Sequence, residues 1–150
     1  MKKFDNYKRN LAVLSRAGEQ DLSNEFIIGG IIDKFSLQFE LGWKVLKELL
    51  RYEGVAIAAT GSPREILKAA YRFYPCMDES IWLGMLAQRN NMAHMYDGAA
   101  AAELAGKVIN EFIPAFQKLS DSIEEKYHGV LEELACIRGT VLLYLSPCVV

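Results

Sequence analysis

Apolar residues return every three or four positions over long windows of this chain, and the alternation that marks a β-strand does not recur. This spacing is typical of amphipathic helices. It predicts helices over about 3–19, 24–52, 63–74, 81–94 and 99–126, with a short, weakly defined helix near 131–137. The sequence therefore predicts an all-α fold of about five helices.

Signals for helix ends sharpen two of these boundaries. Gly54 follows the longest predicted helix and suits a left-handed C-cap. The third helix has the clearest start, because Ser62 can cap it, Pro63 suits its first turn, and Glu65 completes a capping box.

Three further signals concern helix interiors and the chain end. Pro114 is expected to bend the fifth helix, and His128-Gly129 to break the chain after it. The pair Gly29-Gly30 lies inside the long second helix, where close helix packing is the favoured role. No repeat or linker divides the chain. We predict one helical domain over residues 1–138 and a C-terminal tail of unknown order over 139–150.

Composition narrows the class of protein. The 150 residues are 51% hydrophobic and 24% charged, as in globular domains, and the net charge is −2. Such a chain does not hold nucleic acid through global basicity, so any RNA contact must be local. The three cysteines form no CxxC pair and fit a reduced, cytoplasmic setting, while no apolar run approaches the length of a membrane span.

Several standard sites are missing from the sequence. It contains no P-loop, GxGxxG, GxSxG, HExxH or paired-aspartate metal motif. Its two histidines, His94 and His128, are too few for a histidine-rich metal site. We therefore expect neither a metal nor a cofactor.

The segment RNNMAHMY, residues 89–96, is the main candidate for chemistry. At about 100° per residue, Arg89 falls in the middle of the apolar stripe of its helix. A guanidinium stays charged at ordinary pH, so it must reach a carboxylate, a phosphate or a water-filled groove. Asn90 and His94 are spaced i and i+4 and are expected to share the adjacent helix face.

Ordinary structural roles compete with this interpretation. Arg89 can be half of an internal ion pair, with Glu40, Glu48 or Asp97 as partner. A histidine near a helix C-terminus is commonly a dipole interaction. The combination of a fixed cation, two amides, a group that titrates near neutrality and a phenol at one helix end favours a functional site.

The segment resembles the HEPN family (higher eukaryotes and prokaryotes nucleotide-binding domain), and more narrowly its nucleotidyltransferase substrate-binding subfamily. The family's hallmark is an arginine, a polar residue beside it and a histidine four to six residues on, and Arg89, Asn90 and His94 match it. Tyr96 extends the match to the Arg-x-x-x-x-His-x-Tyr form of HEPN toxins that are paired with a minimal nucleotidyltransferase. The resemblance also covers FELGWKVLKELL, SPREILKAA and WLGMLAQRN, at residues 39–50, 62–70 and 82–90, and so spans most of the chain.

This resemblance implies an antiparallel, up-and-down bundle that forms a homodimer or a higher even oligomer. The motif helices of two protomers would meet at one groove, where Arg89, Asn90 and His94 would cleave RNA without a metal. Arg89 would stabilise the phosphorus in the transition state, His94 would act as acid or base, and Asn90 would orient the phosphate or the imidazole. By the same resemblance, a cognate nucleotidyltransferase would transfer AMP to Tyr96 and silence the nuclease.

Two other functions remain open at this point. The chain can be a non-catalytic subunit that presents a nucleotide or another substrate to a nucleotidyltransferase, or a bare helical dimerisation module. A sealed Arg89 paired to a carboxylate would favour the module, and an open groove would favour nucleotide handling. The candidate patch for RNA or nucleotide consists of Lys44, Lys47, Arg51, Arg64 and Lys68, with Arg72 nearby in sequence.

Overall fold

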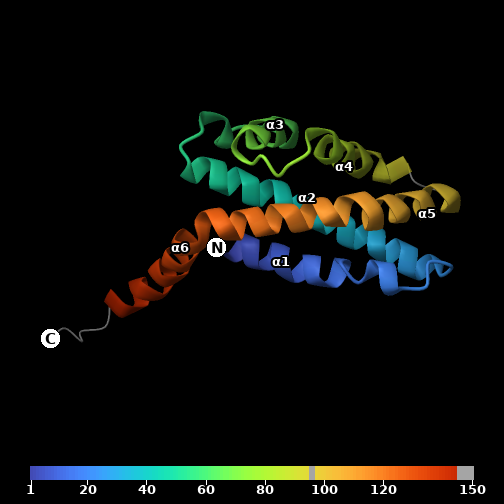
Figure 1. Cartoon of the computed structure of the whole chain (residues 1–150), viewed down its shortest axis with the longest axis horizontal. Helices are drawn as coiled ribbons and strands as arrows, with labels where there is room; N and C mark the ends of the chain where they lie inside the picture. The colour runs from blue at the N-terminus through green and yellow to red at the C-terminus, as the bar shows by residue number, and fades with distance from the viewer. Residues whose placement is uncertain (95–96, 145–150) are drawn as a thin grey trace.

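The chain folds into helices joined by short connections (Figure 1). The computed structural model describes residues 1–94 and 97–144, and the side chains of residues 1–93 and 97–131. Within these residues there are no strands, which confirms the all-α prediction. The α-helices are α1 (Lys2–Leu14), α2 (Glu25–Tyr52), α3 (Pro63–Phe73), α4 (Glu79–Asn91), α5 (Gly98–Lys107) and α6 (Ile113–Tyr144). A π-helical turn, η4 (Val108–Phe112), joins α5 to α6, so that α5, η4 and the part of α6 before Tyr127 form one rod.

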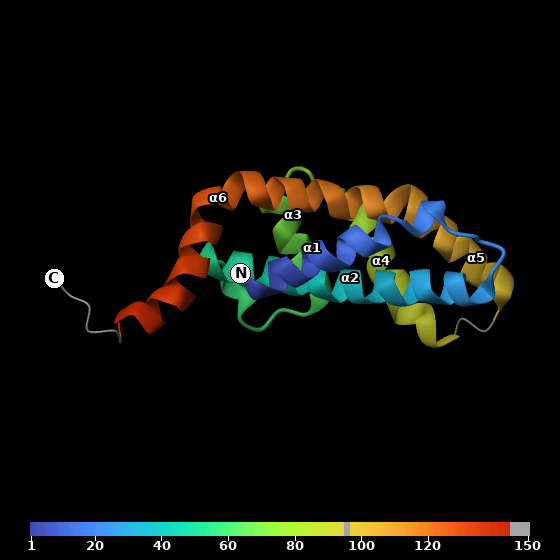
Figure 2. The ribbon, with the colours of Figure 1, turned by 90° about the horizontal axis from the view of Figure 1, so that it is seen from below.

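The helices pack as an antiparallel bundle around α2. α1 runs against α2 in the opposite direction, while α3 and α4 cover another side of it (Figure 1). The rod of α5, η4 and α6 returns along the bundle and contacts both α1 and α2 (Figure 2). The described residues also include three short 3-10 turns: η1 (Ala17–Glu19), η2 (Ala56–Ala58) and η3 (Met92–His94).

Aromatic side chains fill the centre of the bundle. Trp82 of α4 packs edge-on against Phe116 of α6 at 5.4 Å between ring centroids, and Phe35 of α2 stacks on Phe112 of η4 at 5.2 Å. Gly42 of α2 permits this density, because a Cβ atom there would lie 3.3 Å from Tyr7 and 3.4 Å from Trp82. Gly42 therefore marks the close approach of α1 and α4 to α2.

The predicted helix ends at Gly54 and Ser62 are confirmed. Gly54 adopts a positive φ of 77°, the left-handed conformation that glycine tolerates best. The side chain of Ser62 accepts a hydrogen bond from the Glu65 backbone N–H, and the Glu65 carboxylate accepts one from the Ser62 backbone N–H at 2.8 Å. This reciprocal pair fixes the start of α3 behind Pro63.

Four predictions of local structure need correction. α1 ends at Leu14, not near residue 19, where the 3-10 turn η1 stands instead. The distortion expected at Pro114 appears just before it as η4, because proline cannot donate to the carbonyl four residues earlier. His128-Gly129 does not end the helix: the local distortion is at Tyr127, with φ −115° and ψ 19°, and α6 resumes and reaches Tyr144.

The fourth correction concerns Gly29 and Gly30. A Cβ atom at either position would have nothing within 4 Å, so these glycines do not serve close helix packing. Gly29 and Gly30 instead line two different surface grooves beside α2. The sequence pattern pointed to the wrong glycines of this helix, since the closely packed one is Gly42.

A polar junction holds the distorted part of α6 against the ends of α2 and α3. The Tyr127 hydroxyl donates to Glu53 Oε1 at 2.7 Å and lies 2.7 Å from the Tyr74 hydroxyl. Lys126 lies 3.9 Å from the same Glu53 oxygen and 5.1 Å from the Tyr74 ring centroid. Burial is the main cause that raises the pKa of Tyr74 and of Tyr127.

Candidate functional site

The candidate site begins on the buried side of α4. Asp78 caps this helix through hydrogen bonds from the backbone N–H groups of Ser80 and Ile81. The buried residues Trp82, Met85 and Leu86 then follow at helical spacing. Arg89 comes next on this side and faces α2, as the helical wheel predicts, at the point where the buried stripe runs out.

Glu40 of α2 is the partner of Arg89. Arg89 Nη2 lies 2.5 Å from Glu40 Oε1, and the two side chains are 34% and 26% exposed. The geometry is that of an ion pair and not of an aligned hydrogen bond, since Oε1 accepts no directed N–H. Of the three partners considered from the sequence, the structure selects Glu40. Arg89 is thus paired but not sealed from solvent.

Glu40 also joins Arg89 to neighbouring residues of α2. Its other oxygen, Oε2, accepts a hydrogen bond from Trp43 Nε1 at 3.0 Å and lies 3.9 Å from Lys44 Nζ. One carboxylate therefore contacts a guanidinium, an indole N–H and an ammonium. This arrangement fixes the guanidinium at the edge of the bundle without burying it.

Beyond Asn91 the α-helix gives way to the 3-10 turn η3 at residues 92–94. Asn90 is exposed and accepts a hydrogen bond from Arg89 Nη1 at 3.1 Å, so these two residues are brought together. His94 therefore does not continue the α-helix that carries Asn90, and the expectation that their side chains share one face stays a prediction. The side chain of His94 and the whole of Tyr96 lie outside the described residues.

A groove of about 450 Å³ lies beside this segment, between α2, η3 and the start of α5. Its lining includes Met92 and Gly29, and three carboxylates from Glu25, Asp33 and Asp97. The carboxylates give this groove a negative character, which does not suit a phosphate. Sequence reasoning missed this groove because its residues come from three separate elements.

A second groove, of about 640 Å³, has the opposite character. It lies between the start of α1 and the C-terminal half of α2 and contains five basic side chains and one carboxylate. We call it the basic groove. Its lining residues are Lys2, Lys3, Asn6, Trp43, Lys44, Lys47, Glu48 and Arg51. Three predicted patch residues, Lys44, Lys47 and Arg51, thus meet here, and α1 adds two lysines that the sequence patch omitted.

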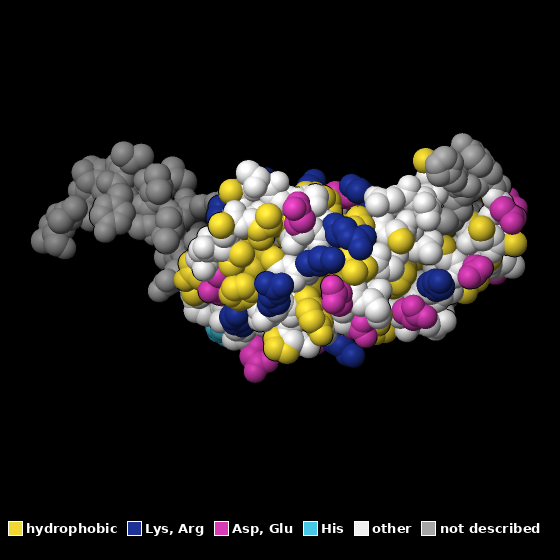
Figure 3. All heavy atoms as spheres, turned by 90° about the horizontal axis from the view of Figure 1, so that it is seen from above, with side chains coloured by type: hydrophobic (Ala, Val, Ile, Leu, Met, Phe, Trp, Pro, Cys, Tyr) yellow, Lys and Arg dark blue, Asp and Glu magenta, His cyan; other side chains and the backbone are white. Residues whose placement is uncertain are grey.

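The other two predicted patch residues belong to a separate surface. Arg64 and Lys68 are exposed on α3 and do not line the basic groove; with Arg72 they repeat every four residues along one side of the helix. Figure 3 shows the face above α3 and α4, where basic side chains gather among apolar and acidic ones. The predicted patch is therefore divided between two places.

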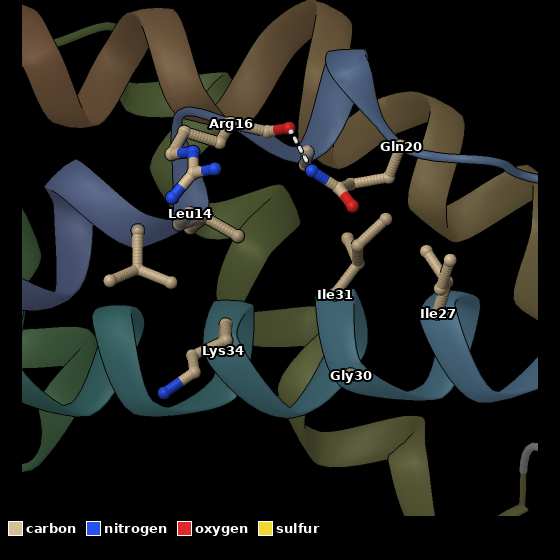
Figure 4. A pocket seen from close by; sticks show the side chains of 9 residues that line it. Leu14, Arg16, Gln20, Ile27, Gly30, Ile31 and Lys34 are labelled. Carbon is tan, nitrogen blue, oxygen red and sulfur yellow. Dashed lines mark hydrogen bonds between the residues drawn. The ribbon is translucent and has the colours of Figure 1, made fainter.

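A third groove is mostly apolar and lies between the end of α1 and the first half of α2 (Figure 4). Ile27 and Ile31 point from α2 toward the opposite segment, which carries Leu14, Arg16 and Gln20. The groove has a volume of about 350 Å³ and contains none of the predicted site residues. Arg16 and Lys34 are the charged residues of its lining, which includes no carboxylate and no histidine.

The described part of the chain has neither a metal-ligand cluster nor a membrane-spanning helix. No three histidine, cysteine, aspartate or glutamate residues among them are grouped as metal ligands. None of the helices in that part of the chain is both long and apolar enough to cross a membrane.

The chain is a helical bundle with Arg89 and Asn90 at the exposed end of α4, and its family match identifies it as a HEPN-like protein. The chain belongs to the family described as nucleotidyltransferase substrate binding protein like, which it matches over residues 2–125. A curated relative from Haemophilus influenzae, named "Probable ribonuclease HepT", is 26% identical over 110 residues. That alignment covers 72% of this chain and 75% of the relative.

Proposed function

We propose that this protein is a metal-independent endoribonuclease of the HEPN type, acting as the toxin partner of a minimal nucleotidyltransferase. The observation that carries the proposal is the state of Arg89: Glu40 holds it in place, yet a third of its side chain stays exposed beside Asn90. The family membership and the ribonuclease name of the relative support it.

The proposed reaction is attack of an RNA 2'-hydroxyl on the adjacent phosphorus. A base takes the hydroxyl proton, the O2'–P bond forms, the P–O5' bond breaks, and an acid gives a proton to the leaving O5'. The products are a 2',3'-cyclic phosphate and a 5'-hydroxyl. In this mechanism Arg89 stabilises the negative charge on phosphorus, Asn90 orients the phosphate, and His94 supplies the base or the acid.

The reaction needs two proton-transfer groups, whereas one chain contributes a single histidine to the motif. A two-fold symmetric dimer brings two copies of each residue to one groove, so that one His94 acts as base and the other as acid. The exposed end of α4, where the buried stripe runs out at Arg89, is the surface that this dimer would use.

An RNA cleavage assay in EDTA tests the nuclease. Wild-type protein is expected to cut RNA to cyclic phosphate ends, and Arg89→Ala and His94→Ala are each expected to reduce the rate by at least about 100-fold. His128→Ala is the matched control and should retain activity. Unchanged cleavage in both motif variants would refute the catalytic assignment.

We further propose that the cognate nucleotidyltransferase transfers AMP to Tyr96. The phenol oxygen would attack the α-phosphorus of ATP, with pyrophosphate as leaving group and the proton passing to a base of the partner. An anionic group on Tyr96, two residues beyond His94, would block RNA at the site. Co-expression with the partner should add the mass of AMP to the peptide that contains Tyr96, and Tyr96→Phe should abolish it.

A non-catalytic substrate-binding subunit is the second candidate function. The family description favours it, as does the ion pair that occupies Arg89 in the single chain. This alternative predicts nucleotide binding without RNA cleavage. The EDTA assay therefore separates the two candidates, because a binding subunit leaves RNA intact with or without His94.

A further inference from the structure

The basic groove stands out from the charge of the whole chain. Five of its eight lining residues are lysine or arginine and one is glutamate, although the chain has a net charge of −2. Glu48 pairs with Lys3 at 3.3 Å. The remaining cations, Lys2, Lys44, Lys47 and Arg51, give the groove a net positive charge where an anion can bind.

Trp43 is the one large apolar residue in this lining, and its ring is half-buried. The ammonium groups of Lys44 and Lys47 lie 5.9 and 6.0 Å from its centroid, at the outer limit of a cation–π contact. Both lysines can therefore move to another anion at little cost. An aromatic ring flanked by mobile cations is the arrangement that binds a base and its phosphates in single-stranded nucleic acid.

The basic groove adjoins the proposed nuclease site. Two of its residues, Trp43 and Lys44, contact the same Glu40 carboxylate that holds Arg89. From Glu40 to Arg51 the helix rises about 16 Å, and Lys44, Lys47 and Arg51 follow each other along it at spacings of three and four. A strand that leaves Arg89 along α2 would meet these cations in turn.

We infer that the basic groove binds the single-stranded RNA next to the phosphate that is cleaved. Trp43 stacks on one base, while Lys44, Lys47 and Arg51 pair with successive phosphates. The lysines of α1, Lys2 and Lys3, close the opposite wall. This inference rests on the proposed ribonuclease function and adds to it a substrate-binding surface.

The lining favours RNA over an acidic peptide as the occupant. Apart from Trp43, every residue that lines the groove is charged or carries an amide. Grooves that bind peptides are lined mainly by apolar and aromatic side chains, which bury the peptide's own apolar residues. Here the available interactions are one stacking surface and several phosphate contacts.

Binding can be measured separately from cleavage with a fluorescein-labelled 2'-O-methyl hexanucleotide, which lacks the attacking hydroxyl. The double variant Lys44→Glu/Lys47→Glu should weaken binding at least about tenfold. It should also make the slope of log K against log salt less steep by about 1.4. Each phosphate contact to a single strand contributes about 0.7 to that slope, and the variant removes two such contacts. The matched control, Lys107→Glu/Lys118→Glu, changes the net charge equally on the α5–α6 rod and should bind like wild type.

The stacking step has its own readout. Of the two tryptophans, Trp82 is 1% exposed, so quenching of tryptophan fluorescence by the oligonucleotide reports Trp43. Trp43→Leu should lose the quenching and bind about tenfold more weakly, and Trp43→Tyr should recover much of the affinity. Circular dichroism of each variant checks that the bundle is folded.

The outcomes distinguish this inference from the proposed function. If the groove double variant weakens hexanucleotide binding but the wild-type protein cleaves no RNA, strand binding is supported and the nuclease function is refuted. Cleavage that is equal in the groove double variant and its control would keep the nuclease and refute the inference. Equal affinity for ATP and the hexanucleotide would mark a mononucleotide site and would also refute it.

Discussion

A single carboxylate, that of Glu40, decides what Arg89 can do. Arg89 lies on the same side of α4 as the buried residues before it, so its guanidinium is partly buried and needs a counterion. The Glu40 carboxylate of α2 is that counterion. The pair is about one-third exposed, so its contribution to the free energy of unfolding is small, at most about 1 kcal/mol. The larger effect of Glu40 is on the position of the guanidinium.

The substitution Glu40→Gln tests this positioning role. We expect kcat for RNA cleavage to fall about tenfold, since a neutral amide holds the guanidinium less firmly in the orientation that catalysis needs. KM should not rise, because the substitution removes a negative charge near the RNA phosphate. Steady-state kinetics gives both values, and Glu103→Gln, an exposed carboxylate of α5 that does not line the basic groove, is the control. An unchanged kcat would contradict the role of Glu40.

At the scale of the elements, the residues that cap helix starts agree best between sequence and structure. Asn24, Ser62, Asp78 and Asp97 each accept a hydrogen bond at the start of a helix. Hydrogen bonds from the backbone and side chain of Ser62 lower the pKa of Glu65 below its ordinary value of 4.5. The capping box is therefore strongest while Glu65 is ionised.

This linkage predicts how stability depends on pH. The pKa of Glu65 is lower in the folded state, so its contribution is complete above about pH 4.5 and is lost as pH falls through the folded pKa. Glu65→Gln should lower the unfolding free energy at pH 6 and make little difference at pH 2.5. Urea unfolding at both pH values measures this, and an equal difference at both would refute the linkage.

The distortion of α6 is a second feature of element scale. Tyr127→Phe removes the hydrogen bond to Glu53 and leaves the buried Tyr74 hydroxyl without that partner. We expect a loss of about 1–3 kcal/mol in unfolding free energy. Tyr52→Phe is the control, because Tyr52 is 57% exposed and its ring packs on Tyr127 without needing the hydroxyl. Equal stability of the two variants would show that the junction contributes nothing.

At the scale of the whole molecule, buried tyrosines couple folding to alkaline pH. Burial raises the pKa of Tyr7, Tyr74 and Tyr127 above the ordinary value of 10.0. The unfolded chain releases these protons near pH 10, whereas the folded chain retains them, so stability falls as pH rises beyond that point.

A tyrosine absorbance titration combined with circular dichroism tests this coupling. The absorbance change from the three buried tyrosines should coincide with the loss of helical signal. Complete ionisation of all tyrosines in a protein that is still helical would contradict the prediction.

Sequence periodicity predicted the helices well because each presents a regular apolar face to one core, and capping residues fixed several of their ends. It failed where the outcome depended on contacts between elements. Gly42 and Gly29-Gly30 occupy the same helix, yet only the packing of Tyr7 and Trp82 distinguishes them. The partner of Arg89 was likewise one of several candidates until α2 was placed beside α4.

The candidate site also has parts that local sequence predicts and parts that depend on contacts between elements. Arg89 and Asn90 could be found from their positions in one helix, because their spacing is local. The basic groove could be predicted only in part, since Lys2 and Lys3 are at least forty positions before Trp43 in the chain. The roles of His94 and Tyr96 stay predictions, to be decided by cleavage and by mass spectrometry.

The junction at Tyr127 also sets the reach of the C-terminal end of α6. Beyond Tyr127 the helix continues to Tyr144 and leaves the bundle (Figure 1). Those residues rise roughly 25 Å, so a rotation of about 10° at the junction would carry the far end through about 4 Å. Contacts of Tyr127 with Glu53 and Tyr74, at the ends of α2 and α3, therefore set the position of the C-terminal end of α6, which lies far from both residues.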